Sequence, residues 1–118
     1  MSNYEVIATG LEFPEGPVVM PDGSIILVEI KRGTITRVDP DNGSVDVVAR
    51  PGGGPNGAAI GPDGALYVCN NGGFEWGENR GLTIPGLVAD DYSSGRIERI
   101  DQRRAQLTWF MPMLTVSR

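Results

Sequence analysis

The stretch PEGPVVMPDGSIILV at residues 14–28 returns in altered form as PNGAAIGPDGALYVC at residues 55–69. The two copies lie 41 residues apart, and each contains a Pro-x-Gly opening, a Pro-Asp-Gly turn and an apolar run. A repeat of about 40 to 45 residues, made of short strands and tight turns, is typical of a β-propeller blade. The sequence therefore predicts an all-β chain that forms about two four-stranded blades of a propeller. A closed ring needs roughly four to eight blades, so two blades are a fragment of one.

The composition agrees with a turn-rich, globular β-protein. The 118 residues include 17 glycines and nine prolines, and 40% of the residues are hydrophobic. The formal net charge of −5 disfavours a nucleic acid or an anionic membrane as a partner. No signal peptide or membrane span is recognisable, so we expect a cytoplasmic chain. The single cysteine, Cys69, lies in an apolar run and is expected to be buried and reduced.

The repeat divides most of the chain into two expected blades, at residues 14–50 and 55–101. The first blade is expected to hold strands at residues 16–20, 24–30, 34–38 and 44–49. In the second blade, the counterparts of the first three strands are residues 57–60, 65–70 and 96–100. The motif GTITRVD at residues 33–39 is echoed by GRIERID at residues 95–101, which is 62 residues later instead of 41. An insertion of 21 residues therefore separates the second and third strands of the second blade.

This insertion, at residues 72–93, contains Phe74, Trp76 and Tyr92 among glycines and acidic residues. Long insertions in compact domains usually serve as lids or binding walls, or they are irregular surface segments. The sequence leaves two interpretations open, a lid over a ligand channel and a surface excursion without a role.

The tail at residues 102–118 departs from the repeat. It has three arginines and no acidic residue, whereas residues 1–101 carry seven basic and fifteen acidic residues. Suitable codons for the tail, read two nucleotides later, can encode a strand similar to residues 42–49. We therefore hypothesise a shifted reading frame or a prematurely ended gene. The alternative is a divergent fourth strand at residues 106–110.

Glu15 is the sharpest candidate for chemistry, because it opens the innermost strand of the first blade. Innermost strands line the central channel of a propeller, and Asn56 is the equivalent residue of the second blade. Carboxylate and amide oxygens suit a hard divalent cation such as calcium, and the lack of histidine disfavours zinc. The alternative is that both residues cap strand ends. Asn70 and Asn71 follow the second strand and either line the channel or form a turn.

The motif FPEGPV at residues 13–18 and GPNG at residues 54–57 carry a resemblance, together with the two Pro-Asp-Gly turns. Over residues 6–101 the chain resembles the senescence marker protein, gluconolactonase and luciferin-regenerating enzyme family. The resemblance implies a six-bladed propeller with a divalent cation, often calcium, in its channel, and hydrolysis of lactones. It also implies that Glu15 is a ligand of that cation, which would polarise the lactone carbonyl and activate a bound water. The other ligands of the family come from later blades, so the resemblance gives Asn56 no ligand role.

The resemblance thus predicts a relationship to metal-dependent hydrolases of sugar lactones, with a small lactone as substrate of the full-length relative. One carboxylate cannot hold a cation that takes six to eight oxygen ligands, so we expect the chain to be inactive alone. Catalytic residues other than the ligands stay unassigned. The alternative function is a non-catalytic propeller module that binds a partner or assembles with itself, since open blade edges favour self-association.

Overall fold

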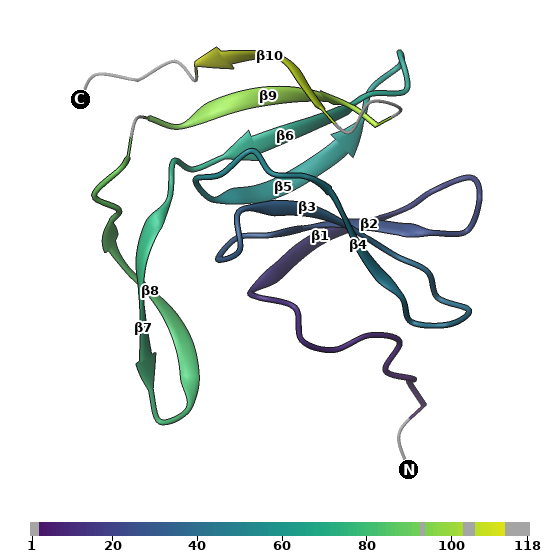
Figure 1. Cartoon of the computed structure of the whole chain (residues 1–118), viewed down its shortest axis with the longest axis horizontal. Coiled ribbons are helices and arrows are strands. Elements are labelled where there is room, and N and C mark those ends of the chain that lie inside the picture. The colour runs from purple at the N-terminus through teal and green to yellow at the C-terminus, as the bar shows by residue number, and fades with distance from the viewer. Residues whose placement is uncertain (1–2, 93, 103–105, 113–118) are drawn as a thin grey trace.

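The computed structural model describes residues 3–92, 94–102 and 106–112, and the regular structure of these residues consists of β-strands (Figure 1). The first blade is an antiparallel sheet in the order β1-β2-β3-β4. Its strands are β1 (Pro14–Val19), β2 (Ile25–Glu29), β3 (Thr34–Val38) and β4 (Val45–Ala49). Each strand pairs with the next one in the chain, as in a propeller blade. The structure confirms the predicted all-β fold class.

The second blade is an antiparallel sheet in the order β10-β9-β6-β5, and it is interrupted in sequence by a separate hairpin. Its strands are β5 (Pro55–Ile60), β6 (Leu66–Asn70), β9 (Arg96–Asp101) and β10 (Gln106–Pro112). The residues inserted between β6 and β9 form a two-stranded sheet of β7 (Phe74–Asn79) and β8 (Leu82–Val88). This hairpin projects away from the two blades (Figure 1).

The two blades share one register. In the first blade Ile25 pairs with Val38, and in the second blade Leu66 pairs with Ile100. These pairs are related by the offsets of 41 and 62 residues that separate the sequence motifs. The insertion therefore lengthens one connection and leaves the pairing of the flanking strands unchanged. Register is held in this way because a slip by one residue would turn every buried side chain to the opposite face.

The Pro-Asp-Gly turns close the first hairpin of each blade in the same manner. Gly23 and Gly64 have φ angles of 86° and 81°, which glycine adopts at little steric cost. The Oδ1 atom of Asp22 accepts a hydrogen bond from the backbone N–H of Ser24, at 2.9 Å. The Oδ1 atom of Asp63 accepts the equivalent bond from the N–H of Ala65, at 3.1 Å. The turn chemistry is thus repeated along with the strands.

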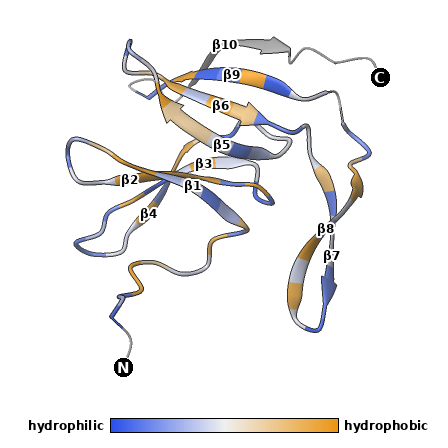
Figure 2. Ribbon diagram, turned by 180° about the vertical axis from the view of Figure 1, so that it is seen from behind, coloured by the Kyte–Doolittle hydropathy of each residue, from blue (hydrophilic) through white to orange (hydrophobic). Residues whose placement is uncertain are grey.

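The core lies between the two blades. It consists of apolar side chains from both sheets: Ile26, Val28, Ile35, Val48 and Ala49 from the first blade, and Leu66, Val68 and Ile100 from the second. Hydrophobic segments of β2, β5 and β6 accordingly lie next to one another in Figure 2. Burying a side chain of the size of Val, Leu or Ile contributes about 1.5–3 kcal/mol, so this face-to-face packing is the main stabilising contact between the blades.

The opposite face of the first blade is covered in part by the segment that precedes β1. Val6, Ile7 and Leu11 line an apolar groove against Leu27 and Val38. The segment is fixed near its end, where the backbone N–H of Glu12 donates to Oε1 of Glu29 at 2.8 Å.

Cys69 is exposed and free, so the prediction of a buried thiol was wrong. The side chains of β6 alternate between the two faces of the sheet. Leu66, Val68 and Asn70 are buried against the first blade, and Cys69 points to the other face, which no other sheet of the described residues covers. An apolar run does not reveal which of its residues face the core.

The tail contributes β10, which pairs antiparallel with β9 and places Gln106 opposite Asp101. This is the divergent fourth strand that the sequence allowed as an alternative, and it ends at Pro112 instead of residue 110. The hypothesis of a shifted reading frame concerns the coding DNA and stays a prediction. Residues 103–105 and 113–118 of the tail lie outside the described residues.

Candidate functional site

The inner strands β1 and β5 bring Glu15 and Asn56 to equivalent places at the start of two adjacent sheets. A β-bulge or similar irregularity follows Glu15 in β1, and the same feature occurs at Asn56 in β5. The strands approach closely, since a Cβ atom added to Gly16 would lie 3.6 Å from the backbone N of Ala58. Both Glu15 and Asn56 are exposed. The repeat therefore places one carboxylate and one amide at the same end of neighbouring inner strands.

The carboxylate of Glu15 lines a shallow depression together with Leu11, Pro14, Pro17 and Leu27. It forms no hydrogen bond or ion pair with another described residue, in contrast to the carboxylates of the turns. A capping carboxylate would accept a backbone N–H, and Glu15 accepts none within this part of the chain. Its side chain is thus available to a ligand.

The described residues do not by themselves fit a hard cation. Among them no three His, Cys, Asp or Glu side chains gather in a way that could hold a metal ion. Calcium takes six to eight oxygen ligands, and Glu15 with Asn56 supplies far fewer. Any cation bound at Glu15 would require further ligands from groups other than those described.

Asn70 has a different place from the other candidates, because it is fully buried beneath the link between the blades. Its Nδ2 donates to the carbonyl oxygen of Gly52 and to Oε1 of Glu98, both at 2.8 Å. Its Oδ1 accepts from the N–H groups of Gly54 and Gly72, both at 2.9 Å. Two donors and two acceptors exhaust what an asparagine amide can offer. Asn70 therefore ties the link between the blades to the start of the insertion.

Asn71 lies next to this cluster and serves two local contacts. Its Oδ1 accepts a hydrogen bond from the N–H of Gly73 at 2.8 Å, and its own N–H donates to the carbonyl oxygen of Gly54. The first contact is an Asx turn that starts the insertion. These bonds agree with the turn interpretation, and a role of Asn71 in lining a channel stays a prediction.

Two buried carboxylates were missed in the sequence, Glu29 in the first blade and Glu98 in the second. Each is 1% exposed. The signal was present, since both occupy core-facing positions within strands of otherwise apolar alternation. In the second blade Glu98 binds Asn70 and pairs with Arg96 across 3.0 Å. The two carboxylates come from different strands, but both neutralise the end of a blade near the inner connections.

Glu29 shows how such a charge is kept in the interior. Burial by itself would raise the pKa of this carboxyl, but the hydrogen bonds donated by Thr36 and Arg32 outweigh it, with those from Glu12 N–H and Thr34, and lower the pKa. Arg32 reaches Oε1 across 2.8 Å. Because every partner is a donor, Glu29 is held as a carboxylate and has a structural role.

The insertion hairpin reaches the start of β1 through aromatic contacts. The ring centroids of Phe13 and Trp76 lie 5.0 Å apart, and those of Phe74 and Trp76 lie 6.2 Å apart. Phe13 has a φ angle of 57°, which is unusual for a bulky residue and needs support from its surroundings. Since Phe13 lies two residues before Glu15, the hairpin contacts the segment that leads into the candidate site.

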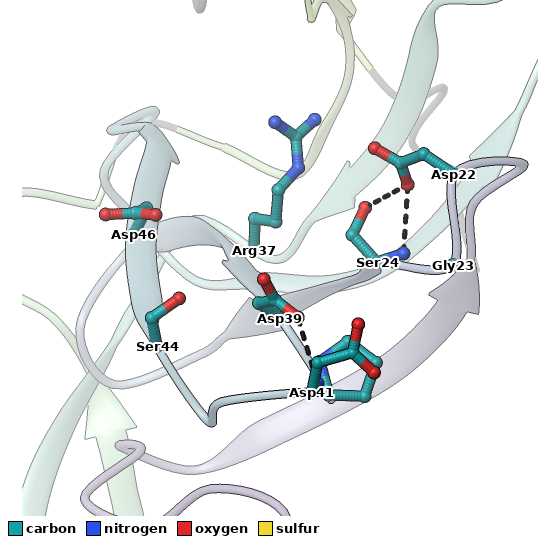
Figure 3. Close-up of a pocket in the computed structure, with 9 residues that line it drawn as sticks. Asp22, Gly23, Ser24, Arg37, Asp39, Asp41, Ser44 and Asp46 are labelled. Carbon is teal, nitrogen blue, oxygen red and sulfur yellow. Dashed lines mark hydrogen bonds between the residues drawn. The ribbon is translucent and has the colours of Figure 1, made fainter.

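A second polar pocket lies at the other end of the first blade, among the β1–β2 and β3–β4 turns (Figure 3). Asp22, Asp39, Asp41 and Asp46 surround Arg37 there. The hydrogen bonds from the hydroxyl and N–H of Ser24, with a smaller contribution from Arg37, lower the pKa of Asp22. Asp39 likewise accepts from the N–H of Asp41. These carboxylates serve their own turns, so the pocket is not a candidate site.

Comparison with known proteins agrees with this architecture. The family described as the SMP-30/Gluconolactonase/LRE-like region matches residues 13–109. A gluconolactonase from Zymomonas mobilis subsp. mobilis is 30% identical over an alignment that covers 58% of this chain and 23% of that protein. The structure of the PQQ-bound form of aldose sugar dehydrogenase from Streptomyces coelicolor superposes with a TM-score of 0.63 at 25% identity. It covers 92% of this chain and 31% of that one.

The chain therefore spans about a quarter of the curated relative and about a third of the solved structure. None of the helices that a membrane span would require, long and apolar, occurs in the described residues.

Proposed function

The chain belongs to the SMP-30/gluconolactonase/LRE-like family, and from this membership we propose that its two blades form part of a metal-dependent hydrolase of sugar lactones. The match over residues 13–109 carries the proposal, because it includes the inner strands and Glu15. The reaction adds water across the ester bond of a cyclic sugar lactone and yields the open hydroxy acid. The similarity to a gluconolactonase of 30% identity supports this class of substrate.

In this proposal Glu15 is one ligand of a divalent cation, with calcium as the preferred ion. The support is chemical, since Glu15 is an exposed carboxylate without a partner among the described residues and lies on an inner strand. Asn56 is placed close to it on β5 and lines the same channel. The remaining ligands have to come from blades other than these two, so the described residues alone do not hydrolyse lactones.

The insertion hairpin is proposed to form a wall of the substrate channel. The contact between Trp76 and Phe13 holds it against the segment that leads to Glu15. Its outer residues Leu82, Leu87 and Val88 are 67%, 77% and 56% exposed. Exposed apolar side chains of this kind often contact a ligand or a neighbouring element. This observation favours the lid interpretation over a surface excursion without a role.

The cytoplasm remains the proposed location. Cys69 is exposed and free, and a reducing compartment keeps such a thiol from forming disulfides between chains.

A chimera tests the proposal directly. In the gluconolactonase of Zymomonas mobilis, the segment that aligns with this chain would be replaced by the matching residues of this chain. We expect the chimera to hydrolyse gluconolactone, and we expect a chelator to abolish the activity in a way that added calcium restores. A folded chimera that fails to open the lactone, or whose activity is indifferent to chelator, would contradict the proposal.

A further inference from the structure

The 41-residue repeat extends to the segment before β1. Residues 4–8 read YEVIA, and residues 45–49, which form β4, read VDVVA. The two stretches share a valine and an alanine at equal positions, and Glu5 stands where Asp46 stands in β4. By this correspondence residues 4–8 have the pattern of the outermost strand of a blade that would precede β1.

In the structure this segment has no strand to pair with. Residues 4–8 form no regular structure, although they contain β-branched and aromatic residues that favour strands. Tyr4 and Val6 are 76% and 65% exposed, and Ile7 is 41% exposed. An exposed, strand-forming segment beside a sheet is suited to pair with the edge of another chain.

We propose that residues 4–8 pair with β9 of a second copy of this chain, in the position that β4 occupies on β3. The pairing of β3 with β4 sets the register, because the same offsets relate all four strands. In this register Glu5 lies opposite Arg99 of the second copy, and Val6 lies opposite its Glu98. The proposal is independent of the lactonase function.

Charge complementarity supports this register. In the first blade Asp46 lies directly opposite Arg37, and the proposed pairing places Glu5 opposite Arg99 in the same way. Opposite charges at such cross-strand positions stabilise a sheet, whereas like charges destabilise it. A slip by one residue would lose this pair and turn the valines to the wrong face.

The faces of the blades support the same partner. Leu66, Val68 and Ile100 of the second blade are buried against the first blade. Their repeat equivalents in the first blade are Ile25, Leu27 and Val38, which face away from the second blade and line the groove beside residues 5–8. The second blade of another copy would cover this face as the first blade covers its own neighbour. Head-to-tail contacts of this kind close into rings, and three copies would supply six blades.

The partner must release β10 before the pairing can form. In one copy β10 occupies the edge of β9 and places Trp109 opposite Arg99. The inferred association is therefore a strand exchange, in which residues 4–8 of one copy replace β10 of the other. We expect assembly to be slow and to depend on protein concentration.

Sedimentation velocity over a range of concentrations tests the association. We expect a discrete oligomer, with three copies for a six-bladed ring. Val6→Pro removes an N–H from the pairing strand, and we expect it to weaken association about tenfold or more. Leu87→Pro is the matched control, since Leu87 is also exposed, at 77%, and lies outside the segment. A monomer at every concentration, or equal effects of both variants, would overturn the proposal.

Disulfide trapping tests the register. In a Cys69→Ser background, a chain with Glu5→Cys is mixed with a chain carrying Arg99→Cys, and a cross-linked dimer is expected because the two positions lie opposite each other. Val6→Cys mixed with Arg99→Cys should cross-link poorly, since its side chain points to the other face. Cross-linking that is equal in the two mixtures, or absent from both, would refute the proposed register.

Discussion

Glu12 and Glu29 both contact Arg32, yet their surroundings differ sharply. Glu29 is 1% exposed and accepts hydrogen bonds from Thr34, Thr36 and Arg32. Glu12 reaches Arg32 across 3.1 Å, but its side chain is 39% exposed. Solvent screens the outer pair, and exposed ion pairs contribute at most about 1 kcal/mol. The inner carboxylate carries most of the stabilising interaction.

Glu29→Gln should therefore lower the free energy of unfolding by about 2–3 kcal/mol, because it removes charge-assisted hydrogen bonds from a buried site. Glu12→Gln should cost less than about 1 kcal/mol. Urea unfolding followed by circular dichroism measures both values. Losses of similar size in the two variants would show that burial does not decide the contribution of these carboxylates.

Asp63 predicts a pH dependence of stability. The backbone N–H of Ala65, with hydrogen bonds from Tyr67 and Arg99, lowers the pKa of Asp63 from 3.8 to about 2. A group whose pKa is lower in the folded state stabilises the fold above its unfolded pKa. This contribution is therefore present above pH 3.8 and disappears as the pH falls toward 2.

Asp63→Asn should be less stable than the parent chain at neutral pH, and the difference should shrink between pH 4 and pH 2. Thermal unfolding at stepped pH values measures this. Asp41→Asn is a suitable control, because Asp41 is an exposed residue of the β3–β4 turn. A difference that stays constant down to pH 2 would contradict the assigned role of Asp63.

At the level of whole strands, the repeat was sufficient to predict most of the architecture. The offsets of 41 and 62 residues predicted which strands are equivalent, and the register of β6 with β9 repeats that of β2 with β3. Strand ends were less accurate, since β1 begins at Pro14 instead of residue 16. Proline is tolerated at the first residue of a strand, so a Pro-x-Gly motif does not mark where pairing starts.

The insertion hairpin was not predicted. Its turn has positive φ angles at Arg80 and Gly81, of 53° and 81°, as in the tight turns that join two adjacent strands. Asparagine or aspartate is the usual residue at the first of these positions, and arginine there hides the signal. The contact of Trp76 with Phe13 depends on tertiary structure, which local sequence cannot reveal.

Trp76→Ala should loosen this hairpin without unfolding the blades. Loss of the contact with Phe13 removes an aromatic pair that contributes about 0.5–1.5 kcal/mol. Amide exchange across residues 74–88 should then accelerate about two- to tenfold, while exchange in β2 and β6 stays unchanged. Leu87→Ala is the control, since Leu87 is largely exposed. Faster exchange throughout both blades would mean that the hairpin is part of the common core.

In the molecule as a whole, two blades bury one face each and leave the others to further partners. The first blade presents Leu27 and Val38 beneath the segment before β1, and the second presents the face that carries Cys69. The sequence predicted Glu15 and Asn56 at equivalent positions, and the structure places both on adjacent inner strands. It could not assign a complete site, because a channel is formed by residues that converge from several blades.

The central claim is that Glu15 binds the cation required for lactone hydrolysis. The most direct test is the kcat/KM for gluconolactone of the Zymomonas mobilis chimera with Glu15→Gln, compared with the unaltered chimera. Loss of a ligand should lower this value about 100-fold or more, and excess calcium should restore it in part. Glu12→Gln is the matched control, because Glu12 lies three residues earlier and pairs with Arg32. A folded Glu15→Gln chimera with unchanged kcat/KM would contradict the account.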